Sequence, residues 1–271
     1  MHPWELYVEG IGLWAPRLAG WSAARSILRG ESAPPEVPAS RPTPALLPQT
    51  ERRRAPDTVA IALEVAASAC AAAGCLPQEL PSVFASAYGD LAVSDAMCEQ
   101  LARSPLDTSP TKFHHSVHNA AAGYWAIATG CLAPYTALAA HRYTFAAGLL
   151  AAAVQALERT RVLFVAYDVE GRGPIATMAR SRGMLGTALL LAPERTLRSR
   201  IGLDIRVEKV PEGVPASATP ARASNAALVE GNAIADGLTL FEALADETER
   251  SVTLTLSAGL ALEVSVRPMH P

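Results

Sequence analysis

Apolar residues follow two periods along the chain, and these periods predict strands that alternate with helices. Short apolar runs and alternation of period two predict strands, whereas apolar spacings of three or four residues predict helices. The predicted strands are 5–12, 82–87, 134–140, 161–167, 187–191, 252–256 and 260–266. The predicted helices are 21–28, 57–73, 95–102, 119–129, 143–157 and 233–245. This alternation predicts an α/β fold with helices on both faces of a sheet.

Glycines and prolines mark the limits of these elements. Gly30, Gly74 and Gly130 follow predicted helices, where glycine is the preferred C-terminal cap. Six prolines lie between residues 32 and 49, so this segment is expected to be a surface excursion. Residues 211–220, rich in proline and alanine, are expected to be a loop. No composition break divides the chain, which predicts one domain over residues 1–271.

Composition excludes two classes of partner. The chain has 271 residues, of which 50% are hydrophobic and 18% are charged, with a net charge of -3 and a pI near 6.1. This balance gives no basic patch of the kind that nucleic acid or an anionic membrane attracts. The low charged fraction indicates that a partner covers part of the surface. Because we find no signal-peptide pattern and no apolar stretch of spanning length, a soluble cytoplasmic protein is expected.

Two segments resemble a known family. The opening YVEGIGLWAPRLAGWSAARSILRGE resembles the start of β-ketoacyl-acyl carrier protein synthases, or ketosynthases. The middle resembles the part of these enzymes in which a helix beginning N-x-x-A-G leads through a turn and a strand to a long helix. The tail SAGLALEVSVRP is similar to their last strand. The residues that carry the middle match are Asn119, Ala122, Gly123, Ile127, Gly130, Pro134 and the strand 162–166.

This resemblance implies a thiolase-like fold with α/β/α/β/α layers and a shortened C-terminal half. Residues 1–168 would form the N-terminal half of the domain, and residues 169–271 an abbreviated second half. It also implies that the strand from Pro134 to Arg142 pairs across the two-fold axis of a dimer, which would cover an otherwise open sheet edge.

The catalytic residues of the family have no counterparts in this chain. Ketosynthases use a cysteine nucleophile in a T-A-C sequence at a strand-to-helix turn, together with two histidines. Carried across without gaps, T-A-C falls on Ala140, His141 and Arg142, so Arg142 or a neighbour occupies the nucleophile position. No H-G-T motif is present, and the nearest counterpart of the second histidine motif, Glu230–Gly237, contains no histidine. The nearest thiol, Cys131, precedes the turn and is expected to be a small buried residue.

This profile resembles chain length factors of type II polyketide systems. The phrases FHHSVHNAAAGYWAIATG and RVLFVAYD are more similar to the short ketosynthase-like proteins of aryl polyene pathways. The resemblance implies a non-catalytic subunit without a cofactor. Its partners would be an active ketosynthase and an acyl carrier protein that carries a polyene or fatty acyl chain. Candidate interface or tunnel residues are Phe113, His118, Trp125, Pro134, Leu138, His141 and Arg142.

Several alternatives stay open at this point. The cluster His114, His115 and His118 invites a metal site, although no clear third ligand lies nearby. Asp168, after a buried strand, is expected to cap a loop or form a salt bridge. The run Glu51–Arg54 is either a solvated face or a contact for an acidic carrier protein.

Two other functions also remain. The chain is either a divergent acyltransferase or decarboxylase that uses Cys131 or His118, or a homodimeric scaffold of the ketosynthase fold. The four cysteines show neither metal-ligand spacing nor a disulfide framework, and they are Cys70, Cys75, Cys98 and Cys131.

Overall fold

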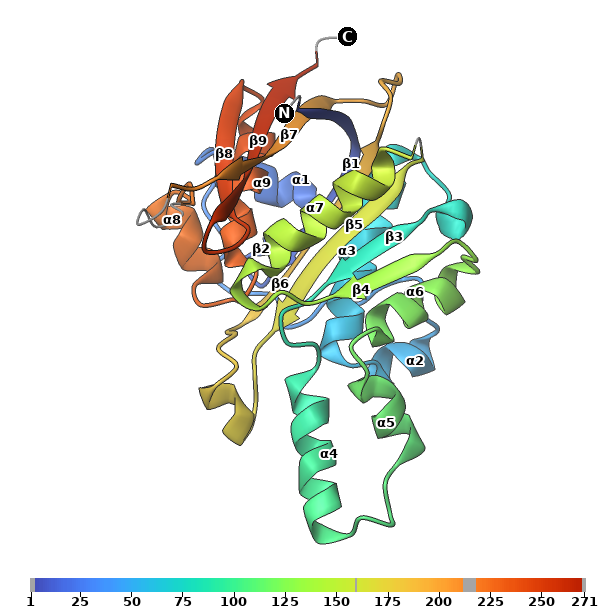
Figure 1. Ribbon diagram of the computed structural model, residues 1–271. Helices are drawn as coiled ribbons and strands as arrows, with labels where there is room; N and C mark the ends of the chain where they lie inside the picture. The colour runs from blue at the N-terminus through green and yellow to red at the C-terminus, as the bar shows by residue number, and fades with distance from the viewer. Residues whose placement is uncertain (1–2, 159, 212–217, 270–271) are drawn as a thin grey trace.

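The computed structural model describes residues 3–158, 160–211 and 218–269 (Figure 1). Its strands are β1 (Trp4–Ala15), β2 (Leu18–Ala19), β3 (Ser82–Ala85), β4 (Tyr135–Leu138), β5 (Val162–Val169), β6 (Met184–Ala192), β7 (Ile201–Lys209), β8 (Arg250–Thr255) and β9 (Leu260–Pro268). Its α-helices are α1 (Trp21–Leu28), α2 (Gln49–Arg54), α3 (Asp57–Ala73), α4 (Leu91–Arg103), α5 (Pro110–Ser116), α6 (Ala120–Thr129), α7 (Thr144–Ala156), α8 (Ala223–Ala226) and α9 (Leu238–Asp246). Short 3-10 helices cover Pro77–Glu79, His141–Tyr143, Pro174–Thr177, Ala227–Val229 and Ala235–Gly237.

The described strands join in one mixed sheet. Its order is β4-β3-β5-β6-β1-β7-β9-β8, and β2 pairs with β1 outside this path. The strands β4, β3 and β5 are parallel, whereas the other neighbours are antiparallel. β4 therefore lies at an edge of the sheet. β1 is long enough to pair with β6 through one half and with β7 through the other, which joins the C-terminal strands to the N-terminal half.

Helices cover both faces of this sheet, and each face has its own apolar core. On one face, α3 and α6 pack against β3, β5 and β6 around Phe84, Leu163 and Val165. On the other face, α7 packs against β3 and β5, α1 packs against β1, and α9 packs against β8 and β9. There Phe145 of α7 lies edge-to-face with Phe164 and Phe241 at centroid distances of 5.5 and 6.3 Å. This arrangement confirms the predicted thiolase-like α/β fold with a short C-terminal half.

The close approach of α3 to β1 depends on two glycines in the opening G-x-G sequence. A Cβ atom at Gly10 would lie 2.0 Å from the carbonyl oxygen of Ala69, and one at Gly12 would lie 2.1 Å from that of Val65. Both distances are far below van der Waals contact. Only glycine therefore lets α3 lie directly on β1.

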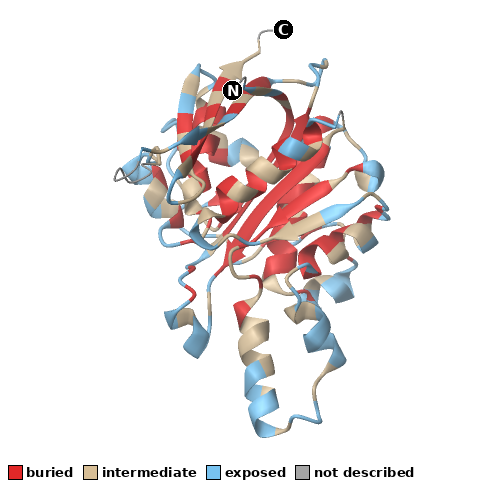
Figure 2. Cartoon of the chain, viewed as in Figure 1, coloured by how far each residue is buried: buried red, intermediate tan, exposed pale blue. Residues whose placement is uncertain are grey.

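One pair of helices projects from this body. α4 and α5 extend away from the sheet as an arm (Figure 1), and most residues of the arm are exposed or only half-buried (Figure 2). Asp90 begins α4 by accepting a hydrogen bond from the backbone N–H of Val93 at 2.9 Å. Ser109 begins α5 by accepting from that of Lys112 at 3.4 Å. The side-chain caps explain why both helices begin where they do.

The predicted elements are found with small shifts at their ends, but β2, β7, α2, α5 and α8 were not predicted, and one helix begins later than expected. β7 (Ile201–Lys209) was not predicted, although Ile201, Leu203 and Ile205 alternate with less buried residues. The predicted helix 233–245 begins only at Leu238, because Ile234 has non-helical backbone angles and residues Ala235–Gly237 form a 3-10 turn. Part of the predicted loop 211–220 lies outside the described residues.

Candidate functional site

The turn between β4 and α7 is the position at which the resemblance places the nucleophile. His141 stands at its sharpest point with φ of 52°, a left-handed conformation that costs a non-glycine residue roughly 1 kcal/mol. Thr144 holds the turn closed: its hydroxyl accepts from the N–H of Ala140 at 2.9 Å and donates to the carbonyl of His141 at 2.6 Å. The strained residue is thus His141, next to the Arg142 predicted for this position.

The side chains at this turn include no thiol and no free aliphatic hydroxyl group. His141 and Arg142 are both exposed, and the guanidinium of Arg142 lies 5.1 Å from the centre of the Tyr143 ring. The hydroxyl of Thr144 is buried and already bonded within the turn. No cysteine or serine lies between residues 139 and 143.

The loop after β3 reaches the same place. The Tyr88 ring meets the His141 ring edge-on at 6.0 Å. The buried carboxylate of Asp168, at the end of β5, holds this loop by accepting from Ser86 Oγ at 3.1 Å, Ala87 N at 2.7 Å and Tyr88 N at 3.3 Å. These bonds agree with the loop-capping role predicted for Asp168. The carboxyl ends of the three parallel strands therefore meet beside the turn.

Burial favours the protonated, neutral form of the Asp168 carboxyl group. It raises the pKa of the carboxyl group to about 7, while the hydrogen bonds from Ala87, Ser86 and Tyr88 act in the opposite direction. Through these hydrogen bonds the carboxyl group positions the loop that follows β3.

Asn232 connects the C-terminal half to the same centre. Its side-chain amide donates to the carbonyl oxygens of Asp168 at 3.1 Å and Arg182 at 3.0 Å. Asn232 belongs to the Glu230–Gly237 segment that corresponds to a histidine motif of ketosynthases. The buried amide thus binds backbone at a position near the turn, where it supplies neither acid nor base.

The three histidines of the 114–118 segment contact different groups. His115 Nε2 lies 2.8 Å from the hydroxyl of Tyr124, whereas His118 Nε2 lies 2.8 Å from the carbonyl of Ser86. The helix that carries His114 and His115 ends at Ser116, so His114 and His118 do not share one helical face. Within the described residues, no three histidine, cysteine or acidic side chains are placed to hold a metal ion.

The tunnel candidates fall into two groups. Trp125 is only 1% exposed and belongs to the core between α6, α3 and the sheet, so its side chain does not reach the surface. Phe113, on the arm, is 60% exposed. Pro134 is also exposed at the edge of the sheet, and Leu138 is half-buried against the core. The position of Trp125 makes it a core residue of this chain.

Cys131 lies at the wrong end of the sheet for a nucleophile at the turn. Its buried thiol is 3.6 Å from the carbonyl of Leu80, just before β3 begins, whereas the turn follows the end of β4.

The arginines of the basic run on α2 differ in their exposure and contacts. Arg52 donates to the carbonyl of Leu47 at 2.8 Å, and Arg53 and Arg54 are exposed.

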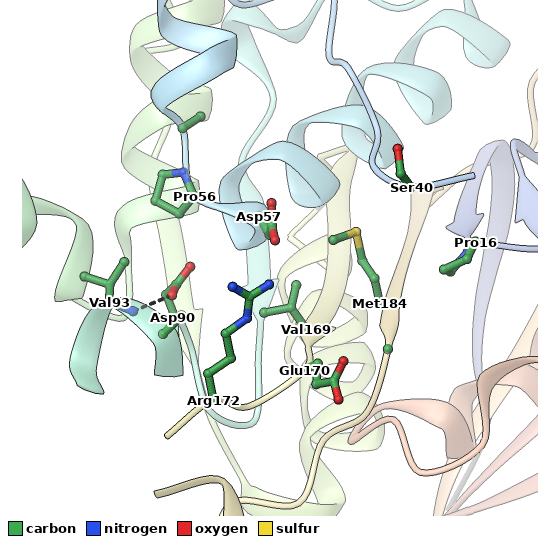
Figure 3. Close-up of a pocket in the computed structure, with 13 residues that line it drawn as sticks. Pro16, Ser40, Pro56, Asp57, Asp90, Val93, Val169, Glu170, Arg172 and Met184 are labelled. Carbon is green, nitrogen blue, oxygen red and sulfur yellow. Dashed lines mark hydrogen bonds between the residues drawn. The ribbon is translucent and has the colours of Figure 1, made fainter. Parts of the chain in front are cut away.

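A cavity of about 440 Å³ opens at the carboxyl end of β5 (Figure 3). The carboxylates of Asp57 and Asp90 line it, and both have partners within the chain. Asp57 forms an ion pair with Arg41 at 3.0 Å, and Asp90 accepts hydrogen bonds from Thr58 and Val93. Arg172 extends into the space between them. A second cavity of about 400 Å³ adjoins Arg142 and Tyr143. The cavity in Figure 3 has charged walls but no cysteine or histidine among its lining residues.

Comparison with known proteins identifies the family. A family model described as beta-ketoacyl synthase, N-terminal domain, matches residues 20–251, which is most of the chain. The chain belongs to this family. No curated protein matches the chain by sequence.

Several solved structures share the fold of this beta-ketoacyl synthase family member. A ketosynthase (ApeO) in complex with its chain length factor (ApeC) from Xenorhabdus doucetiae matches with a TM-score of 0.71 and 18% identity, over 96% of this chain and 98% of that chain. The ishigamide ketosynthase/chain length factor matches with a TM-score of 0.69 and 16% identity, over 98% and 99%. A beta-ketoacyl synthase from Burkholderia phymatum STM815 matches with a TM-score of 0.68 and 9% identity, over all of both chains.

Sequence reasoning missed three residues around the turn between β4 and α7 and the loop that follows β3. Ser86, Tyr88 and Asn232 were not singled out, although all three contact groups at or near the turn. A usable signal was the polar sequence that follows β3 directly, since the carboxyl ends of parallel strands are where sites form.

No membrane-spanning helix occurs in the part of the chain that the structure describes.

Proposed function

We propose that this chain is a non-catalytic, chain-length-factor-like subunit that pairs with an active ketosynthase. The pair would elongate polyene or fatty acyl chains held on an acyl carrier protein. The observation that carries the proposal is the turn between β4 and α7, where His141 and Arg142 stand in place of a nucleophile. A thiolate or alkoxide is required to accept an acyl group in this kind of condensation, so the partner must supply it.

The open edge of β4 supports the pairing. Bonds from β3 occupy the carbonyl groups of Pro134 and Leu138, at 3.2 Å each. Because backbone groups alternate sides along a strand, the N–H and C=O of Tyr135 and Ala137 point to the other side. No described strand pairs there. An unpaired edge of this kind is a template for a strand of another chain.

Apolar side chains accompany this edge. Ile127 of α6 is 78% exposed, Leu132 is 95% exposed, and Val154 of α7 is about half exposed. α6 contacts β4 directly, and α7 is tied to it by a hydrogen bond of 3.1 Å from Gln155 to Thr136. A strand edge with apolar residues beside it is typical of a protein–protein interface. We assign this surface to the ketosynthase partner and the exposed arm residue Phe113 to the chain that the pair elongates.

Reconstitution tests the missing chemistry. The purified chain, incubated with malonyl- and acyl-carrier protein, should give no elongated product by mass spectrometry and should carry no acyl group itself. Addition of an active ketosynthase from the same organism should give elongated products. Elongation or covalent acylation by the chain alone would instead favour the divergent acyltransferase.

Substitution of Ala137 by proline tests whether the free edge of β4 pairs with the ketosynthase. Its missing N–H faces away from β3, so Ala137→Pro should leave the melting temperature of the isolated chain nearly unchanged and abolish co-purification with the ketosynthase. Leu138→Pro is the matched control, because it removes a bond to β3 and should destabilise the chain itself by about 3 kcal/mol or more. Wild-type co-purification of a folded Ala137→Pro variant would show that β4 is not the interface. A homodimer that forms without a ketosynthase and dissociates in this variant would favour the scaffold.

A further inference from the structure

The C-terminal cap of α3 brings two cysteines together. Gly74 adopts a left-handed conformation, with φ of 57°. The N–H of Cys75 donates to the carbonyl of Cys70, and that of Gly74 to the carbonyl of Ala71, at 3.0 Å each. This pair of bonds defines a Schellman motif, in which the side chains at the two ends of the larger ring pack against each other. Here both ends are cysteines.

The two thiols differ in their surroundings. Cys70 is buried in the core on the α3 face of the sheet, and Cys75 is half-exposed and packs against the same core. Arg161 Nη1 lies 3.8 Å from the Cys75 sulfur. The guanidinium is fixed by an ion pair of 3.0 Å between its Nε and the buried carboxylate of Glu9. Cys75 is half-exposed whereas Cys70 is buried, so a dissolved peroxide reaches the Cys75 thiol first.

Cys70 is suited to the second role. Burial raises the pKa of its thiol to about 12, so it stays protonated and does not react first. The remaining nearby thiol, Cys131, is directed to the carbonyl of Leu80 at 3.6 Å. The thiol of Cys75 is likewise directed to a carbonyl, that of Leu76 at 3.6 Å, but the backbone hydrogen bond to Cys70 keeps these two residues adjacent.

We propose that Cys70 and Cys75 form an intramolecular disulfide when the protein meets a peroxide. The Cys75 sulfur attacks one peroxide oxygen, which gives a sulfenic acid and releases one water molecule. The Cys70 sulfur then attacks the sulfenic sulfur, and the displaced hydroxide takes the Cys70 proton and leaves as a second water molecule. The two thiols are oxidised and the peroxide is reduced. This modification site is independent of the proposed subunit role.

Proteolytic cleavage of the chain after glutamate isolates Cys70 and Cys75 in one peptide, so their oxidation state can be measured by mass spectrometry. Cuts after Glu64 and Glu79 release the peptide Val65–Glu79, which contains both thiols and no other cysteine. After treatment of the folded protein with hydrogen peroxide, this peptide should lose two hydrogen atoms, resist alkylation until reduced, and regain both thiols with dithiothreitol. The same reaction in urea should be about tenfold slower, because the cap no longer holds the thiols together.

Variants separate this reaction from general oxidation. Cys98→Ser, which removes the exposed thiol of α4, should leave the loss of two hydrogen atoms unchanged. Cys70→Ser should instead let Cys75 proceed to the sulfinic acid, and Cys75→Ser should leave Cys70 open to alkylation after unfolding. Overoxidised Cys75 with a free Cys70 in the wild-type protein would overturn the proposal. A peptide cross-linked to Cys131, or equal rates with and without urea, would also overturn it.

Discussion

Truncation of Trp125 separates a core role from a tunnel role for the largest side chain of α6. The resemblance makes Trp125 a tunnel candidate, but the structure encloses it within the chain's own core, 1% exposed, between α6, α3 and the sheet. Its indole N–H has no hydrogen-bond partner within the described part of the chain. Trp125 therefore contributes through packing alone.

The expected magnitude follows from this burial. Trp125→Ala removes a buried indole and leaves a cavity that the surrounding helices cannot fill, which costs about 3 to 5 kcal/mol of unfolding free energy. For a domain of this size, that loss lowers the melting temperature by on the order of 10 °C. Trp125→Phe loses no hydrogen bond and keeps most of the volume, so we expect a loss of only about 1 to 2 kcal/mol.

Phe113 supplies the matched comparison, because it is 60% exposed. Phe113→Ala should change stability by less than about 0.5 kcal/mol. If Phe113 limits the acyl chain, its truncation opens space for one more two-carbon unit, worth about 1.5 kcal/mol or about a tenfold preference for the longer product.

The assay is urea unfolding of each variant, alongside product lengths from the reconstituted pair. We expect Trp125→Ala to be destabilised with unchanged products, and Phe113→Ala to be stable with longer products. Longer products from a Trp125→Ala subunit of wild-type stability would refute the assignment of Trp125 to the core.

Two further predictions concern stability. Burial raises the pKa values of Asp168 and Asp236 from 3.8 to about 7 in the folded state, so the folded chain binds these protons more tightly than the unfolded chain. Their stabilisation is complete below about pH 4 and is lost as pH rises to about 7, at about 1.4 kcal/mol per pH unit for each group. Asp168→Asn should remove about half of this slope in urea unfolding across that range, and an unchanged slope would contradict its assignment to Asp168. Gly12→Ala places a Cβ atom 2.1 Å from the carbonyl of Val65, so it should lower the melting temperature sharply, whereas Gly123→Ala, with open space at Cβ, should not. Equal melting temperatures for the two alanine variants would show that α3 can move away from β1.

The sequence was most informative where a local pattern and a local cap agree. α3 was predicted over its full length because its apolar face ends at Gly74, which adopts the left-handed conformation expected of a cap. The alternation in β7 was also readable, although Asp204, Arg206 and Glu208 lie between its apolar residues, and no strand was predicted there. Local pattern failed at Ala233, because the chain turns at Ile234 with non-helical backbone angles before α9 begins.

The candidate site depended on contacts that no local pattern contains. Asp168 and Ser86 are 82 residues apart in the chain, and only the parallel pairing of β3 with β5 brings them together. The burial of Trp125 likewise depends on how α6 lies against α3. The absence of a cysteine or serine between residues 139 and 143, in contrast, could be read from an alignment of the turn alone.

The turn at His141 keeps a strained shape without a cysteine or serine between residues 139 and 143, and packing gives the reason. Gly148 of α7 lies so close to β3 and β5 that a Cβ atom would be 2.7 Å from Ala85 and from Phe164. α7 must therefore lie directly on these strands, which requires the chain to leave β4 abruptly. Thr144 and the left-handed His141 make that turn possible. The same constraint fixes the course of the chain where it leaves β4 at the edge of the sheet, so packing alone accounts for the shape of the turn.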